Sequence, residues 1–98
     1  LPIKYNSLLR ETNYGIMEGK TGSIINSNPK LRAICDAVNA GNNDAHFENG
    51  ESRRMVADRF LQFLTSLNDI NKNILIITHG GILRGYLKIY GKIDFRNL

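Results

Sequence analysis

The sequence feature that most constrains the fold is the apolar run at residues 74–78, Ile-Leu-Ile-Ile-Thr, which is followed directly by His79-Gly80-Gly81. The run is rich in β-branched side chains and shows no alternation of polar and apolar residues. Such a pattern is typical of a strand that is covered on both faces of a sheet. The two glycines favour a tight turn. The segment therefore predicts a buried strand, a turn and a helix over residues 82–90.

Two more helices are predicted from local signals. Asn28 can cap a helix that begins at Pro29, where the fixed φ of proline suits the first turn. A longer helix is predicted over about residues 51–67, because its apolar residues recur at helical spacing. The apolar face of the first helix consists of Leu31, Ile34, Cys35 and Val38, and that of the second of Val56, Phe60, Phe63, Leu64 and Leu67.

The order of elements predicts an α/β fold in one unit without an internal linker. Residues 1–5 form a first short extended segment, and residues 12–28 form a glycine-containing loop with one helical turn near residues 24–25. Only two strands are visible, and an isolated two-stranded sheet is marginally stable in water. We therefore expect the remainder of the sheet to lie outside these 98 residues.

Composition narrows the class of protein further. Apolar residues make up 42% and charged residues 22% of the chain, which is ordinary for a globular domain. No apolar run is long enough to cross a membrane, and no signal-peptide pattern is present. The single cysteine, Cys35, excludes an internal disulfide and a zinc site built from several cysteines. These features predict a cytoplasmic protein.

The net charge of +4 is compatible with an anionic partner. The basic residues are scattered, however, and Arg53-Arg54 is the only adjacent pair. Without a basic arm or a stripe of basic and aromatic residues, nucleic acid is an improbable partner. A small phosphorylated metabolite fits better.

His79 is the strongest candidate for a functional residue, because it lies between a predicted strand and a predicted helix. Ligands of α/β proteins bind beyond the carboxyl ends of strands, where helix N-termini offer free N–H groups to anions. Gly80 and Gly81 allow a phosphate to approach the backbone, and an imidazole can donate a hydrogen bond to a phosphoryl oxygen. The alternative is a histidine that only caps the end of the strand.

Two weaker candidates lie elsewhere in the chain. Glu11 precedes a glycine-bearing loop and could act as a general acid, although a solvated loop glutamate has the same pattern. Gly50-Glu51-Ser52 stands at a predicted helix start, where a carboxylate also complements the helix dipole. Neither a serine-hydrolase motif nor a histidine pair at metal-binding spacing is present, so we expect no metal and no cofactor.

Three segments together resemble the histidine phosphatase (phosphoglycerate mutase-like) superfamily. They are residues 9–19 (Leu-Arg-Glu-Thr-Asn-Tyr-Gly-Ile-Met-Glu-Gly), Gly50-Glu51-Ser52, and residues 74–83 around His79. The resemblance implies a three-layer α/β/α fold and a phosphohistidine mechanism. It assigns Glu11 as the proton donor and His79 as the residue that stabilises the phosphoryl group. It also implies that the Gly50-Glu51-Ser52 loop borders the pocket. We expect Tyr14, Gly80 and Gly81 to contact the phosphate or the substrate as well.

The sequence departs from the family pattern at the nucleophile. The family's nucleophilic histidine lies in an Arg-His-Gly motif after the first strand, but the two histidines here are His46, between Ala45 and Phe47, and His79. The resemblance therefore implies that residues 1–98 correspond to the C-terminal half of a domain, without its first strand. Such a chain is predicted to be inactive alone and to need its missing N-terminal half or a second copy.

The predicted function of the parent protein is hydrolysis of phosphomonoesters. Thr12, Asn13 and Gly22 occupy places where the mutases carry basic or histidine side chains for a second phosphate, which favours a phosphatase over a mutase. A non-catalytic phosphate-binding module, or a half-domain completed by another chain, is the alternative. The substrate is not identified by the sequence.

Overall fold

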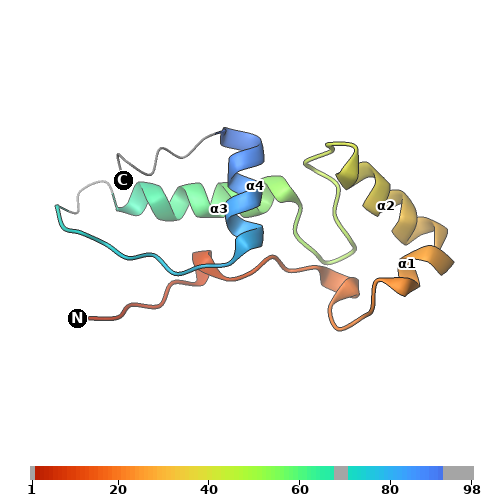
Figure 1. Ribbon diagram of the computed structural model, residues 1–98, viewed down its shortest axis with the longest axis horizontal. Helices are drawn as coiled ribbons and strands as arrows, with labels where there is room; N and C mark the ends of the chain where they lie inside the picture. Colours follow the sequence, from red (N-terminus) through yellow and green to blue (C-terminus); the bar gives the residue numbers. More distant parts are fainter. Residues whose placement is uncertain (1, 68–70, 92–98) are drawn as a thin grey trace.

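This computed structural model describes residues 2–67 and 71–91 (Figure 1). The regular elements of this part of the chain are helices. The radius of gyration is 15.7 Å, compared with about 13 Å expected for a compact chain of this length. The molecule is accordingly elongated, with extents of 51 × 26 × 18 Å. In chain order the elements are η1 (Ser7–Leu9), η2 (Gly15–Met17), α1 (Ser23–Ser27), α2 (Pro29–Asn39), α3 (Arg53–Ser66) and α4 (Gly80–Tyr90).

The predicted three-layer α/β/α fold is wrong for this chain, because the described residues contain no strand and no sheet. Residues 74–78 are irregular, and Leu75 and Ile77 expose 86% and 81% of their surface. Leu1 lies outside the described residues, and residues 2–5 are likewise irregular and exposed. A strand is held by backbone hydrogen bonds to a neighbour, and the described residues provide none for either segment.

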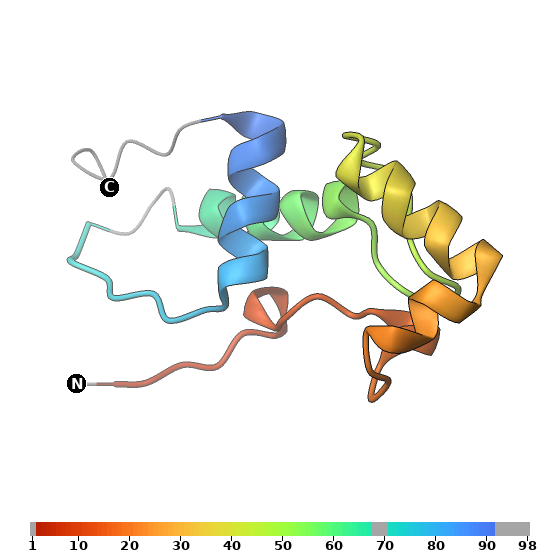
Figure 2. The ribbon, with the colours of Figure 1, turned by 45° about the vertical axis from the view of Figure 1, so that its right-hand side comes forward.

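The core lies where α4 crosses α3 (Figures 1 and 2). Val56, Phe60 and Phe63 of α3 and Ile82 of α4 are buried there as one cluster. The ring of Tyr86 meets Phe60 edge to face, with 5.3 Å between the ring centroids. The apolar face predicted for residues 51–67 is therefore confirmed, because Leu64 and Leu67 also pack against this cluster.

The helix ends follow local capping chemistry. The Asn28 side chain accepts hydrogen bonds from the backbone N–H groups of Lys30 and Leu31, which confirms the predicted start of α2 at Pro29. Ser52 caps α3 by accepting from the N–H of Met55, so that helix begins two residues later than predicted. In contrast, α4 begins at Gly80, two residues earlier than predicted.

The short helix α1 packs on α2 at the end of the molecule opposite the N-terminus (Figure 2). The predicted helical turn near residues 24–25 is thus confirmed as α1. Leu31 is buried on α2, whereas Ile34, Cys35 and Val38 are only half-buried. Among the described residues, no helix is long and apolar enough to cross a membrane.

Candidate functional site

Glu11 and His79 lie side by side, although they are separated by most of the chain. Glu11 follows η1, and His79 immediately precedes α4. The distance between Glu11 Oε2 and His79 Nδ1 is 3.9 Å, and both side chains remain about half exposed to solvent. An anion could therefore reach both groups. An acid and an imidazole at this separation can act on two atoms of one small ligand.

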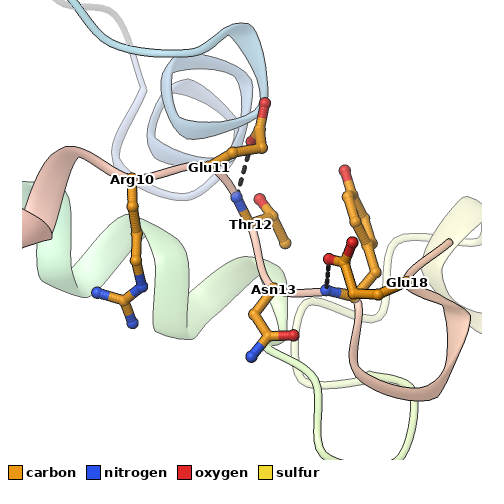
Figure 3. A pocket seen from close by; sticks show the side chains of 6 residues that line it. Arg10, Glu11, Thr12, Asn13 and Glu18 are labelled. Carbon is orange, nitrogen blue, oxygen red and sulfur yellow. Dashed lines mark hydrogen bonds between the residues drawn. The ribbon is translucent and has the colours of Figure 1, made fainter.

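The carboxylate of Glu11 is fixed against the start of α4. Its Oε1 accepts a hydrogen bond of 2.8 Å from the backbone N–H of Thr12. Figure 3 shows the side chain directed toward the first turn of α4, whereas Arg10 points away from it. A Cβ atom at Gly81 would lie only 2.5 Å from Glu11 Oε1. A side chain at position 81 would displace the Glu11 carboxylate from this position, so Gly81 permits the close approach.

His79 occupies the N-cap position of α4 in an extended conformation, and its side chain makes no capping hydrogen bond. The first N–H groups of an α-helix have no partner within the helix. The N–H groups of Gly80 and Gly81 are the first two of α4, and these residues lie next to His79 and the Glu11 carboxylate. Backbone N–H groups at a helix start favour an anion such as a phosphoryl group.

Glu51 has a different environment, because its carboxylate is bound by Arg59 of α3. Arg59 Nε donates to Glu51 Oε2 at 2.8 Å, and Arg59 Nη2 donates to Oε1 at 3.0 Å. The backbone N–H of Asn13 also donates to Oε1, at 2.9 Å. These hydrogen bonds lower the pKa of Glu51 below its ordinary value, and the bond from Arg59 has the largest effect. Burial of the carboxylate acts in the opposite direction and raises the pKa. The Glu51 carboxylate is therefore ionised and held in place by Arg59.

The same Arg59 side chain also holds the backbone around Glu11. Its guanidinium donates to the carbonyl oxygen of Leu8 at 2.7 Å and to that of Glu11 at 3.2 Å. Arg59 is only 8% exposed. The Glu51–Arg59 ion pair thus joins α3 to the segment that carries Glu11.

Arg59 is not among the predicted site residues, although the sequence carries a signal for it. Arg59 lies three residues after Val56, within the apolar face of α3, where a basic side chain requires a partner. Glu51, eight residues earlier, supplies that partner.

The remaining predicted residues border the site without touching His79 or Glu11 in the described contacts. Gly50 lies against the backbone of Tyr14, and Ser52 is the buried cap of α3. Tyr14 is half exposed and lines an open cavity of about 460 Å³. That cavity is otherwise lined by Arg10, Glu11, Thr12, Asn13 and Glu18.

His46 lies in a different environment from His79. Its Nδ1 is 2.9 Å from the carbonyl oxygen of Phe47, in the exposed loop that precedes α3. Within residues 2–67 and 71–91, no group of three or more His, Cys, Asp or Glu side chains is placed to hold a metal ion.

Comparison with known proteins identifies the family. The model of the histidine phosphatase superfamily (branch 1) matches residues 1–98, so the chain belongs to this superfamily. No curated protein and no solved structure shows significant similarity to it. The predicted resemblance is confirmed at the level of the superfamily, which includes phosphatases and mutases. The roles of Glu11, His79 and the residues around them stay predictions.

Proposed function

We propose that this chain contributes the proton donor and the phosphate-stabilising histidine of a phosphomonoesterase that acts through a phosphohistidine intermediate. The observation that carries the proposal is the 3.9 Å approach of Glu11 to His79 at the start of α4. Membership of the superfamily supports the reaction class. The absence of basic side chains at Thr12, Asn13 and Gly22 supports a phosphatase rather than a mutase.

In the proposed reaction, a nucleophilic histidine nitrogen attacks phosphorus and the bond to the ester oxygen breaks. Glu11 donates its proton to the leaving alkoxide, which departs as the alcohol. The ionised Glu11 then takes a proton from water, whose oxygen attacks the phosphohistidine and releases inorganic phosphate and the free imidazole. Throughout, His79 and the N–H groups of Gly80 and Gly81 stabilise the charge on the phosphoryl oxygens.

The attacking histidine is proposed to come from outside these residues, in an N-terminal half of the domain. The sequence supports this, because it has no Arg-His-Gly motif and its two histidines are His79, which is assigned as the stabilising residue, and His46, which lies in the exposed loop before α3. The exposed apolar side chains of Leu75 and Ile77 offer a surface for such a partner. A cytoplasmic location is part of the proposal and is supported by the single cysteine.

The test compares the chain with a longer protein expressed from the same gene together with its upstream coding sequence. We expect only the longer protein to hydrolyse p-nitrophenyl phosphate. The Glu11→Gln and His79→Ala variants should lower its kcat at least about 100-fold, whereas Glu48→Gln, at an exposed glutamate that does not line the cavity next to Glu11, should leave it unchanged. Full activity after His79→Ala would contradict the proposal, and so would a longer protein that neither binds nor hydrolyses the ester.

A further inference from the structure

The segment at residues 71–78, which leads into His79, is held by few interactions. It contains no regular structure, and Leu75 and Ile77 are largely exposed. Among the described residues, the Thr78 hydroxyl makes the one hydrogen bond of this segment, which it donates to the carbonyl oxygen of Leu9 at 2.7 Å. The donor lies directly before His79, and the acceptor lies two residues before Glu11. The bond therefore joins the two chain segments that carry the proposed functional groups.

Apolar packing brings these two segments to the same part of the molecule. Leu8 and Leu9 pack against the α3–α4 core, and so does Ile76. Apolar contacts are not directional, so they leave the two backbones free to shift along each other. A hydrogen bond is satisfied only within a narrow range of distances and angles. The bond from Thr78 to Leu9 thus fixes a relative position that the apolar contacts leave open.

Arg59 holds the segment of Glu11 from the opposite side, through the carbonyl oxygens of Leu8 and Glu11. The carbonyl of Leu9, which lies between these two in the sequence, accepts from Thr78 instead. The His79 side chain makes no capping hydrogen bond of its own. Arg59 therefore fixes Glu11 relative to α3, and Thr78 fixes it relative to His79.

The chemistry of threonine suits such a connection. The branched Cβ restricts χ1, so the Thr78 hydroxyl is held in one direction. The side chain is half-buried, where a carbonyl group without a partner is costly. Adjacent Cα atoms are only about 3.8 Å apart, so a displacement of Thr78 is transmitted to His79 through a single peptide unit.

We propose that Thr78 is a positioning residue, which holds the Glu11 carboxylate and the His79 imidazole at their separation of 3.9 Å. The inference rests on the proposed function, in which Glu11 protonates the leaving oxygen and His79 stabilises the phosphoryl group. Thr78 takes no part in the proton transfer and acts through the backbones of Leu9 and His79. A misplacement of about 1 Å can lower the rate of a reaction about 100-fold, so loss of this bond should be visible in catalysis.

The first experiment uses the longer protein and two esters that differ in their need for a proton donor, phenyl phosphate and p-nitrophenyl phosphate. Phenolate is the stronger base, so its departure depends more on Glu11. Thr78→Val should lower kcat/KM about tenfold for phenyl phosphate and only about twofold for p-nitrophenyl phosphate. Glu11→Gln should discriminate between the esters in the same direction and by a larger factor. A merely structural defect would lower both values equally, and that result would overturn the proposal.

Two control variants accompany this measurement. Thr78→Ser keeps the hydroxyl and should retain most of the wild-type kcat/KM for both esters. Thr65→Val makes the same change at an exposed threonine of α3, whose hydroxyl donates to the Leu61 carbonyl at 2.9 Å, and should leave both values unchanged. The proposal is wrong if Thr78→Ser is as impaired as Thr78→Val, or if Thr65→Val shows the same selective loss.

The second experiment observes the two side chains without catalysis. In the isotope-labelled 98-residue chain, we expect a nuclear Overhauser effect between the ring protons of His79 and the side-chain protons of Glu11. The effect should weaken in Thr78→Val and persist in Thr78→Ser and Thr65→Val, with helical circular dichroism retained in all three. An undiminished effect in Thr78→Val, or loss of its helical signal, would overturn the positioning role. If the effect weakens there while Glu11→Gln keeps full activity on phenyl phosphate, the proposed function fails and the positioning role stands.

Discussion

The α3–α4 pair and the segment at residues 71–79 contain similar apolar side chains but bury them very differently. In the helix pair, Val56, Phe60 and Ile82 are almost completely buried. In the extended segment, Leu75 and Ile77 are largely exposed. A helix satisfies its own backbone and needs a partner only for one face, which α3 and α4 provide for each other. A strand also needs a partner for its backbone, and none lies among the described residues.

The largest expected effect is a difference in unfolding free energy between variants in these two regions. Phe60→Ala removes a buried ring from the core and should lower the free energy of unfolding by about 3–5 kcal/mol. Ile77→Ala, in the exposed segment, should change it by no more than about 0.5 kcal/mol. Urea denaturation followed by circular dichroism measures both. Similar losses for the two variants would contradict the difference in burial.

The next effect concerns the ion pair that joins the helix pair to the segment of Glu11. Arg59→Met leaves Glu51 without its main partner and should destabilise the chain by about 2–4 kcal/mol. Arg54→Met is the matched control, because Arg54 pairs with Asp44 at the exposed surface, where solvent screening makes such pairs contribute little to stability. Equal values for the two arginines would show that the partly buried pair has no special importance.

The difference between local signals and long-range contacts explains which features could be predicted from the sequence. The start of α2 was predicted because Asn28-Pro29 and the spacing of Leu31 are local signals that the folded chain uses. The strand at residues 74–78 was predicted wrongly, because an apolar run reports a need for burial and not the presence of a neighbour. The family resemblance assigns Glu11 and His79 to one reaction, and the structure places their side chains 3.9 Å apart. The hydrogen bonds from Arg59 to the carbonyl oxygens of Leu8 and Glu11 join residues about fifty positions apart in the sequence, which periodicity does not reveal.

A smaller effect tests the start of α3. Ser52→Ala removes the side chain that accepts from the N–H of Met55, and losing such a cap costs about 1 kcal/mol. Ser27→Ala at the end of α1 is a suitable control, because its hydroxyl donates to the carbonyl of Ile24 in a short exposed helix. Thermal unfolding of both variants should show the larger loss for Ser52. A larger loss for Ser27 would contradict the capping role.

The smallest effect is a dependence on acid pH. Because the folded-state pKa of Glu51 lies below the ordinary glutamate value of 4.5, ionised Glu51 stabilises the folded chain above that pH. This stabilisation is lost as the pH falls through the lowered pKa. Glu51→Gln should therefore flatten the decline of unfolding free energy between neutral and acid pH, whereas Glu48→Gln, at an exposed glutamate, should not. Identical pH profiles for the wild type and Glu51→Gln would contradict this assignment.

The most direct test of the central claim asks whether the chain can form a phosphohistidine by itself. The purified 98-residue chain would be incubated with p-nitrophenyl phosphate at neutral pH and analysed by mass spectrometry for phosphate on His46 and His79. Because the attacking histidine is proposed to lie outside the chain, we expect neither phosphohistidine nor release of p-nitrophenol above the rate without protein. Phosphate on either histidine, with turnover that His79→Ala abolishes, would contradict the account.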